Sequence, residues 1–551
     1  ILQDERFCHD LMRDAALQHL PQAVRKLLHA QWAELLASDP RVPAGHLAEH
    51  WAAAERWAEA GEACFRAGLA AHQTGRLDDN SRLMLRAADW FERAGLPQRR
   101  IDALCQRLDA ELVRVGGAVV VAQALDLLEQ DVTPLQRAEL LQVACEAWLN
   151  LADFDAVLAR APALMEASAL WPARLSGSLC LQARALAAQH QTDDALPLLQ
   201  RAVALAEQHA AQDGDEAPLA HALGHLAYAC YMQGHRLPEA MATQRRAADM
   251  ALRLGDPADH AIHSSNLATM LQLQGEPAAA LAQAELTHQS YRRLHASAGH
   301  AAAINDLTLG LCAWHQGQAG PALAVLTTAE QNLSTDGAPP AAVLKAQVAL
   351  ADVWLQLGQP GRALACLVAT PAHRALAPAM FQALWHFARW RALPPTAESD
   401  RAAAQAAALA TAAQVPNLAL GPGLLRDWMS AVPTADALAA LPSVESAAQA
   451  SHALGLLRSL RLMRMCRLQQ AGQWADAHAL ACAALDDREL SLHTATHPLQ
   501  AWRWLAEVFE ANGDTSRAGT CHQAARQWAE SAAQTLPDGL AAPFLATLRQ
   551  G

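Results

Sequence analysis

The chain has 551 residues, of which 52% are hydrophobic and only 5% aromatic, and its 55 acidic and 42 basic residues give a formal net charge of −13. Alanine and leucine carry the apolar content, which favours helices packed on helices and counts against a β-sandwich, a β-barrel or a doubly wound α/β fold. The negative charge counts against direct binding of nucleic acid or of an anionic membrane, and no run of 18 apolar residues predicts a membrane span.

The termini and the cysteines bear on cellular context. The eleven cysteines are scattered singly with no Cys-x-x-Cys pair, a pattern typical of buried thiols in a reducing cytoplasm. The chain opens on Ile1 without an initiator Met or the charged-then-apolar order of a signal peptide. We therefore expect a cytoplasmic chain that is a piece of a longer polypeptide.

The first predicted segment, residues 1–95, is a helical lead-in. It contains Phe7-Cys8-His9-Asp10-Leu11 and, further on, Leu47-Ala48-Glu49-His50-Trp51. This order resembles the junction that follows the nucleotide-binding module in bacterial STAND-type regulators, such as LuxR-type and maltose-regulator-type activators. The resemblance implies an NTPase and a DNA-binding module upstream in the same polypeptide, with Phe7, Leu11 and Leu17 on an apolar face toward it. The chain itself lacks a Gly-x-x-x-x-Gly-Lys-Ser/Thr loop, so we expect no nucleotide site here.

One motif in this segment favours a different class of function. His46-Leu47-Ala48-Glu49-His50 follows the His-x-x-Glu-His order of inverted zinc peptidases, with two histidines one helical turn apart. No third ligand accompanies it, and it lies inside the phrase just described. We interpret the two histidines as structural, and expect no catalytic residue, metal or cofactor.

A repeat runs through the second predicted segment, residues 96–375. A helix ends at a glycine, and a new helix opens on an alanine five residues later, as in Gly275 to Ala280, Gly317 to Ala322 and Gly358 to Ala363. The alanines are 42 and 41 residues apart. Glycine ends the first helix because it adopts a positive φ. Each unit is therefore a helical hairpin that must stack on its neighbours to bury its apolar surface.

The repeat resembles the tetratricopeptide family. The last unit matches best, with Trp502, Leu505, Ala506, Phe509 and Gly513 at the family spacing. The resemblance implies an all-α fold, a right-handed α-solenoid with a period near 41 residues. Residues 376–450 are less regular and predict degenerate hairpins or a joint, and residues 451–551 predict C-terminal repeats.

The candidate site is the concave face lined by the first helix of each hairpin. In peptide-binding members of the family two columns on this face hold Asn and Lys, and the positions that match here are Asn266 and Lys345. His221 and His225 occupy the same columns, and Tyr228, Thr269 and Asp352 lie one turn further along. Lys345 stands out because the chain has only one other lysine, Lys26.

These features predict a non-catalytic sensor segment of a cytoplasmic bacterial regulator that binds a protein, peptide or small inducer on its concave face. Two alternatives remain open: a free-standing scaffold for complex assembly and, more remotely, a metal-dependent hydrolase.

Overall fold

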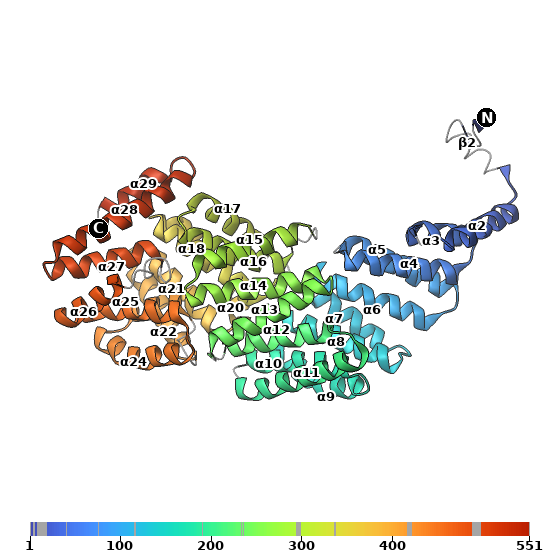
Figure 1. Cartoon of the computed structure of the whole chain (residues 1–551), viewed down its shortest axis with the longest axis horizontal. Helices are drawn as coiled ribbons and strands as arrows, with labels where there is room; N and C mark the ends of the chain where they lie inside the picture. Colours follow the sequence, from blue (N-terminus) through green and yellow to red (C-terminus); the bar gives the residue numbers. More distant parts are fainter. Residues whose placement is uncertain are drawn as a thin grey trace. The chain divides into compact units, whose positions relative to one another are not determined.

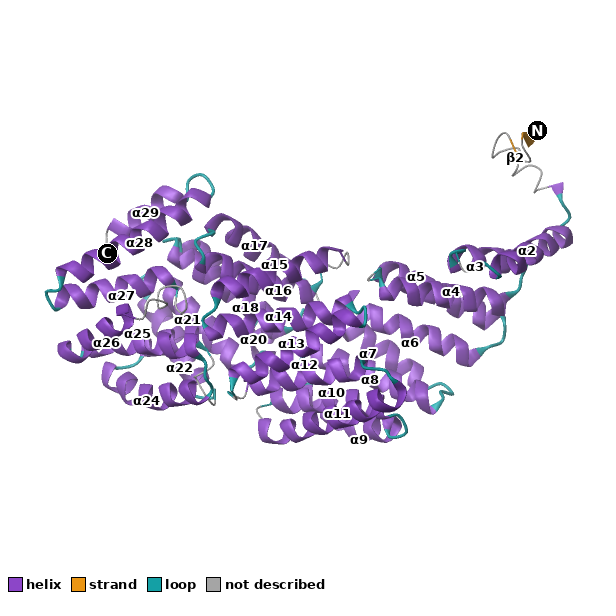
Figure 2. Ribbon diagram, in the orientation of Figure 1, coloured by secondary structure: helices purple, strands orange, loops and turns teal. Residues whose placement is uncertain are grey.

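The computed structural model describes residues 2–3, 6–7, 19–39, 41–74, 76–114, 117–189, 191–232, 234, 236–293, 299–335, 338–415, 421–486 and 497–549. Helices α2 to α29 account for nearly all of this chain (Figure 2). Two short strands, β1 (Leu2–Gln3) and β2 (Arg6–Phe7), pair in antiparallel register. The all-α solenoid of helical repeats is thus confirmed.

The chain divides into two compact units, residues 1–147 and 148–551. The helices of the first unit are α2 (Gln22–Ala37), α3 (Ala44–Ala53), α4 (Trp57–Gln73), α5 (Leu77–Arg93), α6 (Pro97–Arg114), α7 (Gly117–Leu128) and most of α8 (Pro134–Asn150). Consecutive helices from α2 to α7 pack on one another, so hairpin stacking already begins within the predicted lead-in. Leu11 and Leu17, and the side chain of Phe7, lie outside the described residues.

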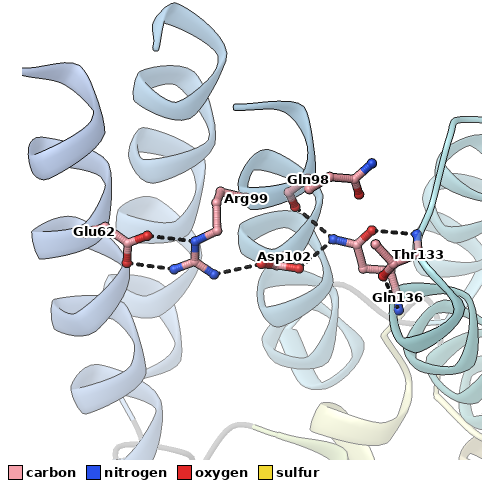
Figure 3. Close-up of polar contacts among 6 residues, drawn as sticks. All are labelled: Glu62, Gln98, Arg99, Asp102, Thr133 and Gln136. Atoms are coloured by element: carbon pink, nitrogen blue, oxygen red, sulfur yellow. Dashed lines mark hydrogen bonds and ion pairs between the residues drawn. The ribbon is translucent and has the colours of Figure 1, made fainter. Parts of the chain in front are cut away.

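Polar side chains connect the first helices of successive hairpins in this unit (Figure 3). The Arg99 guanidinium donates to both carboxylate oxygens of Glu62, at 2.7 Å each, and to Asp102, also at 2.7 Å. The amide nitrogen of Gln136 then donates to Asp102 at 2.6 Å and to the carbonyl of Gln98 at 2.8 Å. Glu62, Arg99 and Gln136 are each 37 residues apart. The repeat therefore includes α4, α6 and α8. Glu62 and Arg99 are in direct polar contact, and Gln136 is connected to Arg99 through Asp102.

A capping box starts α8 and orients Gln136 for this network (Figure 3). The backbone nitrogen of Thr133 donates to the side chain of Gln136 at 3.0 Å, and the backbone nitrogen of Gln136 donates to the Thr133 hydroxyl at 3.2 Å. Both groups would otherwise be unpaired at the helix start.

The second unit is built from helical repeats followed by a less regular set of helices. Its repeat helices are α9 (Phe154–Ser168), α10 (Pro172–Ala188), α11 (Thr192–Asp213), α12 (Ala217–Met232), α13 (Leu237–Arg253), α14 (Pro257–Gln274), α15 (Pro277–Arg293), α16 (His300–His315), α17 (Ala319–Leu333), α18 (Pro340–Gln356) and α19 (Pro360–Cys366). They are followed by α20 (Pro371–Leu376), α21 (Ala379–Ala392), α22 (Glu398–Ala412), α23 (Pro422–Ala431), α24 (Thr434–Ala450), α25 (Leu454–Gln470), α26 (Trp474–Asp486), α27 (Pro498–Ala511), α28 (Thr515–Thr535) and α29 (Ala541–Arg549).

The repeat has the period and the local chemistry that the sequence predicts. The first helices α12, α14, α16 and α18 begin 40, 43 and 40 residues apart. The turn residues Gly275, Gly317, Gly358, Gly472 and Gly513 all adopt φ between +72° and +87°. The small residues of the preceding helices are buried where paired helices meet, namely Ala227, Ala268, Gly310, Ala351 and Ala506.

The last third of the chain returns onto the middle of the same unit, which the sequence did not predict. The backbone nitrogen of Leu237 donates to the carbonyl of Ser451 at 2.7 Å. The indole nitrogen of Trp528 donates to the carbonyl of His315 at 3.2 Å, so α28 lies against the α16–α17 hairpin (Figure 1). These contacts join segments about 210 residues apart in sequence and cover part of the solenoid.

Candidate functional site: an internal cavity between the repeats and the C-terminal helices

A cavity of about 370 Å³ lies in the second unit. This volume is within the size range of small-molecule sites. One wall comes from the first helices α12, α14, α16 and α18, and none of its lining residues comes from the second helices α13, α15 or α17. The other wall comes from α21, α23, α25 and α27. The concave face that the sequence predicts is therefore covered by the returning C-terminal helices.

Five of the seven predicted site residues meet at this cavity. Tyr228 lies on α12, Asn266 and Thr269 lie on α14, and Lys345 and Asp352 lie on α18. The first helices of successive hairpins run parallel to one another. Residues at the same distance from their turn glycines therefore align along the wall. The register counted back from the turn glycines thus identifies residues that line one space.

His221 and His225 do not line the cavity and form a separate pair. Their Nε2 atoms are 3.0 Å apart, and Nδ1 of His221 lies 3.8 Å from Asp259. Burial, followed by the neighbouring His221, holds the pKa of His225 well below its usual value. A histidine in that environment is neutral near pH 7, so we interpret the contact between His221 and His225 as a hydrogen bond within α12.

Lys345 is the cation of the cavity that no carboxylate neutralises. Its side chain is partly buried, and no described residue forms a hydrogen bond or ion pair with its ammonium group. Burial lowers its pKa from the usual value, because a desolvated charge without a partner is unfavourable. Lys26, by contrast, pairs with Glu55. One of the two lysines of the chain therefore lies on the cavity wall without an ion-pair partner among the described residues.

Asp352 lies on the cavity wall but is already paired. It forms ion pairs with Arg391 and Arg426, and Asp427 bonds to Arg426 Nε at 2.8 Å and lies 3.2 Å from Arg391. Burial alone would raise the pKa of Asp352, but the two guanidinium charges lower it. This group of two carboxylates and two guanidinium ions is neutral overall and joins α18, α21 and α23.

The remaining polar groups are neutral and distributed over both walls. The Asn266 carboxamide has no hydrogen-bond partner among the described residues and faces the cavity. The Thr269 hydroxyl lies 3.4 Å from that of Thr308. Burial lowers the pKa of His315 to about 4 and holds that of His497 well below its usual value, so both line the cavity as uncharged rings near pH 7.

Sequence reasoning missed the residues of the second wall. Phe381, Leu384, Arg426, Met463 and Gln500 line the cavity from helices far along the chain. Phe381, Leu384 and Arg426 lie in the segment 376–450, which lacks the repeat pattern, whereas Met463 and Gln500 lie in the predicted C-terminal repeats. In both segments no local signal tells which face of a preceding solenoid the helices will cover. The two glycines of Gly421-Pro422-Gly423, which bring backbone to the cavity wall, were the nearest hint.

The His-x-x-Glu-His motif makes other contacts. Glu49 forms an ion pair with Arg86 at 2.7 Å, and Nδ1 of His50 lies 2.9 Å from Nδ1 of His29. The described residues hold no group of three or more His, Cys, Asp or Glu side chains placed to bind a metal ion. None of the described helices combines the length and hydrophobicity that a bilayer crossing requires.

Comparison with known proteins adds no family. No protein-family model matches the chain, and no curated protein sequence matches it.

Proposed function

We propose that this chain is the ligand-binding segment of a cytoplasmic bacterial regulator, built from long tetratricopeptide-like repeats and without catalytic activity of its own. The observation that carries the proposal is the cavity of about 370 Å³ that collects Tyr228, Asn266, Thr269, Lys345 and Asp352. It presents an ammonium group that no described residue pairs with, beside apolar surface, and this combination suits ligand binding. The STAND-like lead-in supports the assignment to a regulator.

The position of the cavity favours a small inducer over an extended peptide. A peptide ligand of a helical-repeat groove needs an open concave face. Here α21, α23, α25 and α27 form a second wall over that face. A molecule enclosed between the two walls contacts both at once and can bias their association, which is the property a sensor needs.

The test begins with a thermal-shift screen of small molecules on the whole chain, with hits measured by calorimetry. Replacing Asn266 and Lys345 together with Ala should weaken binding of a hit at least tenfold, about 1.4 kcal/mol, and leave the circular dichroism spectrum unchanged. Lys26→Ala is the matched control and should bind as the wild type does. Unchanged affinity in the double variant would show that Asn266 and Lys345 do not hold the ligand, and would leave the residues of the joint, 376–450, as the candidate site.

The regulator part of the proposal has its own test in the coding sequence. A Gly-x-x-x-x-Gly-Lys-Ser/Thr loop encoded within about 300 residues before Ile1, two domains of about 150 residues each, would support it. Its absence there would favour the free-standing scaffold.

One observation favours that second candidate. Helix α2 exposes Leu27, Trp32 and Leu35, with 58%, 53% and 59% of their surface accessible. Leu28 is also exposed on α2. Large exposed apolar side chains gathered on one helix are typical of protein contacts, so partner binding at α2 is the expectation of the scaffold alternative.

A further inference from the structure

We infer that the cavity binds a small monocarboxylate whose anionic group pairs with Lys345 and whose body is apolar. The inference rests on the proposed function and narrows its ligand to one chemical class. It follows from the charge of the cavity wall, from the character of the remaining surface and from the size of the space.

The charge of the wall favours one negative charge. The ionised residues that line the cavity are Lys345, Asp352 and Arg426. Asp352 and Arg426 belong to the neutral group with Arg391 and Asp427. Among the described residues, the ammonium of Lys345 is therefore left as one uncompensated positive charge, although the whole chain carries −13.

A carboxylate matches this charge better than a phosphate monoester. One carboxylate neutralises one ammonium group, whereas a phosphate monoester carries about −1.5 to −2 near pH 7 and would leave buried charge without a partner. Burying an unpaired charge is costly. Lysine also binds an anion as a compact point charge, without the two-pronged geometry of arginine. A single lysine therefore neutralises one anionic group and not a second one.

The rest of the surface is mostly apolar and calls for an apolar body. Six large side chains from both walls contribute to it: Tyr231, Ile304, Leu311, Phe381, Leu384 and Met463. The neutral carboxamide of Asn266 can accept or donate one hydrogen bond at the same cavity. A ligand with a second charge would find no described partner for it.

The volume limits the ligand to a small molecule. At about 30 Å³ for each water molecule in the liquid, a space of 370 Å³ corresponds to roughly a dozen waters. A ligand that replaces them has roughly a dozen non-hydrogen atoms, as 4-phenylbutyrate and medium-chain fatty acids do.

The experiment compares an acid with its own amide on the whole chain. 4-Phenylbutyrate and 4-phenylbutanamide have the same shape and differ in charge, and octanoate with octanamide forms a second pair with an aliphatic body. Calorimetry should show each acid binding at least tenfold more tightly than its amide. Lys345→Met removes the charge but keeps the length of the side chain, and should abolish this preference. Lys26→Met is the matched control and should retain it.

A second readout needs no ligand. Because no described residue pairs with the ammonium of Lys345 in the cavity, Lys345→Met should raise the melting temperature of the ligand-free chain. Lys26→Met, which breaks the pair with Glu55, should not raise it. A lower melting temperature for Lys345→Met would mean that the ammonium is satisfied in the free protein, and would overturn the inference.

The outcomes separate this inference from the proposed function. Ala349→Phe places a ring on the cavity wall and should block acid and amide alike. If amides bind as tightly as acids, or if the preference survives Lys345→Met, the carboxylate inference is wrong while ligand binding in the cavity stands. If all four probes fail to bind at about 1 mM, the weak end of specific affinities, the inference also fails. The proposed function fails only if every hit of the screen binds Ala349→Phe as it binds the wild type.

Discussion

The contact between α25 and the turn after α14 can be tested by adding one methyl group. Gly455 lies in the first turn of α25, and a Cβ atom there would lie 2.5 Å from the backbone nitrogen of Gly275, 2.6 Å from its Cα and 2.7 Å from the carbonyl oxygen of Leu273. All three are backbone atoms, which cannot rotate away as a side chain can. Gly455→Ala must therefore push the C-terminal helices away from α14.

The expected cost is that of overpacking, about 1–3 kcal/mol. The better helix propensity of alanine offsets at most about 1 kcal/mol of it. Gly519→Ala is the matched control, because Gly519 is exposed on α28 and a Cβ there would meet nothing within 4 Å. The control should leave the stability unchanged or raise it slightly, whereas Gly455→Ala should lower it.

Hydrogen exchange read by mass spectrometry is the suitable assay, because a chain of two units need not unfold in a single step. A loss of 1–3 kcal/mol corresponds to roughly 5- to 150-fold faster exchange, at about 1.4 kcal/mol for each factor of ten. The acceleration should appear in peptides from α14 and α25 and not in those from α4 and α5. Wild-type exchange at α14 and α25 in Gly455→Ala would show that the C-terminal helices do not contact the repeats there in solution.

Three further substitutions probe the repeat, the buried histidines and the ionic group. Ala268→Leu adds bulk where paired helices meet and should lower the free energy of unfolding by about 1–3 kcal/mol. Ala403→Leu, on the exposed side of α22, should change the melting temperature little. Equal melting curves for the two variants would refute the register assigned to the repeat. Burial lowers the pKa of His263 to about 4, against about 6.5 when unfolded, so between these values the unfolded chain binds the extra proton and stability falls as pH decreases. His263→Gln should flatten that slope by up to about 1.4 kcal/mol per pH unit, and an unchanged slope in thermal melts from pH 7 to pH 4 would contradict the assignment. Asp427→Ala leaves Arg391 and Arg426 with one carboxylate fewer and should lower the free energy of unfolding by about 3–5 kcal/mol. Asp79→Ala, which removes an exposed pair with Arg82, should lower it by at most about 1 kcal/mol. Similar losses of stability for both variants would mean that the ionic group is solvated.

The sequence was sufficient for features set by local chemistry. A glycine that ends a helix needs a positive φ, so Gly275 and Gly317 could be placed at turns from sequence alone, and they adopt it. Counting back from Gly275 and from the equivalent Gly358 predicted that Asn266 and Lys345 face the same side, and both line the cavity. Periodic packing of neighbouring helices allows such counts along a solenoid, although His221 and His225, placed in the same columns, do not line the cavity.

Contacts between distant segments could not be predicted in this way. The return of α25 and α28 onto the repeats depends on Gly455 meeting Gly275 and on Trp528 reaching the carbonyl of His315. These residues have no repeating pattern to relate them, and each could serve a local role equally well. The same limit explains Asp352: its register position was predicted, but its partners Arg391 and Arg426 lie in helices whose placement was not.

The covered groove changes what a ligand can do in this fold. In an open solenoid a ligand bridges neighbouring repeats, which already hold one another in place. Here the cavity separates the wall of Asn266 and Lys345 from that of Phe381 and Gln500, and the ionic group of Asp352, Arg391, Arg426 and Asp427 crosses between the same two sides. A ligand that contacts both walls stabilises their association in proportion to its occupancy. Under the proposed function, the free energy of ligand binding would therefore stabilise the contact between the repeats and the C-terminal helices, and a sensor would signal through that contact.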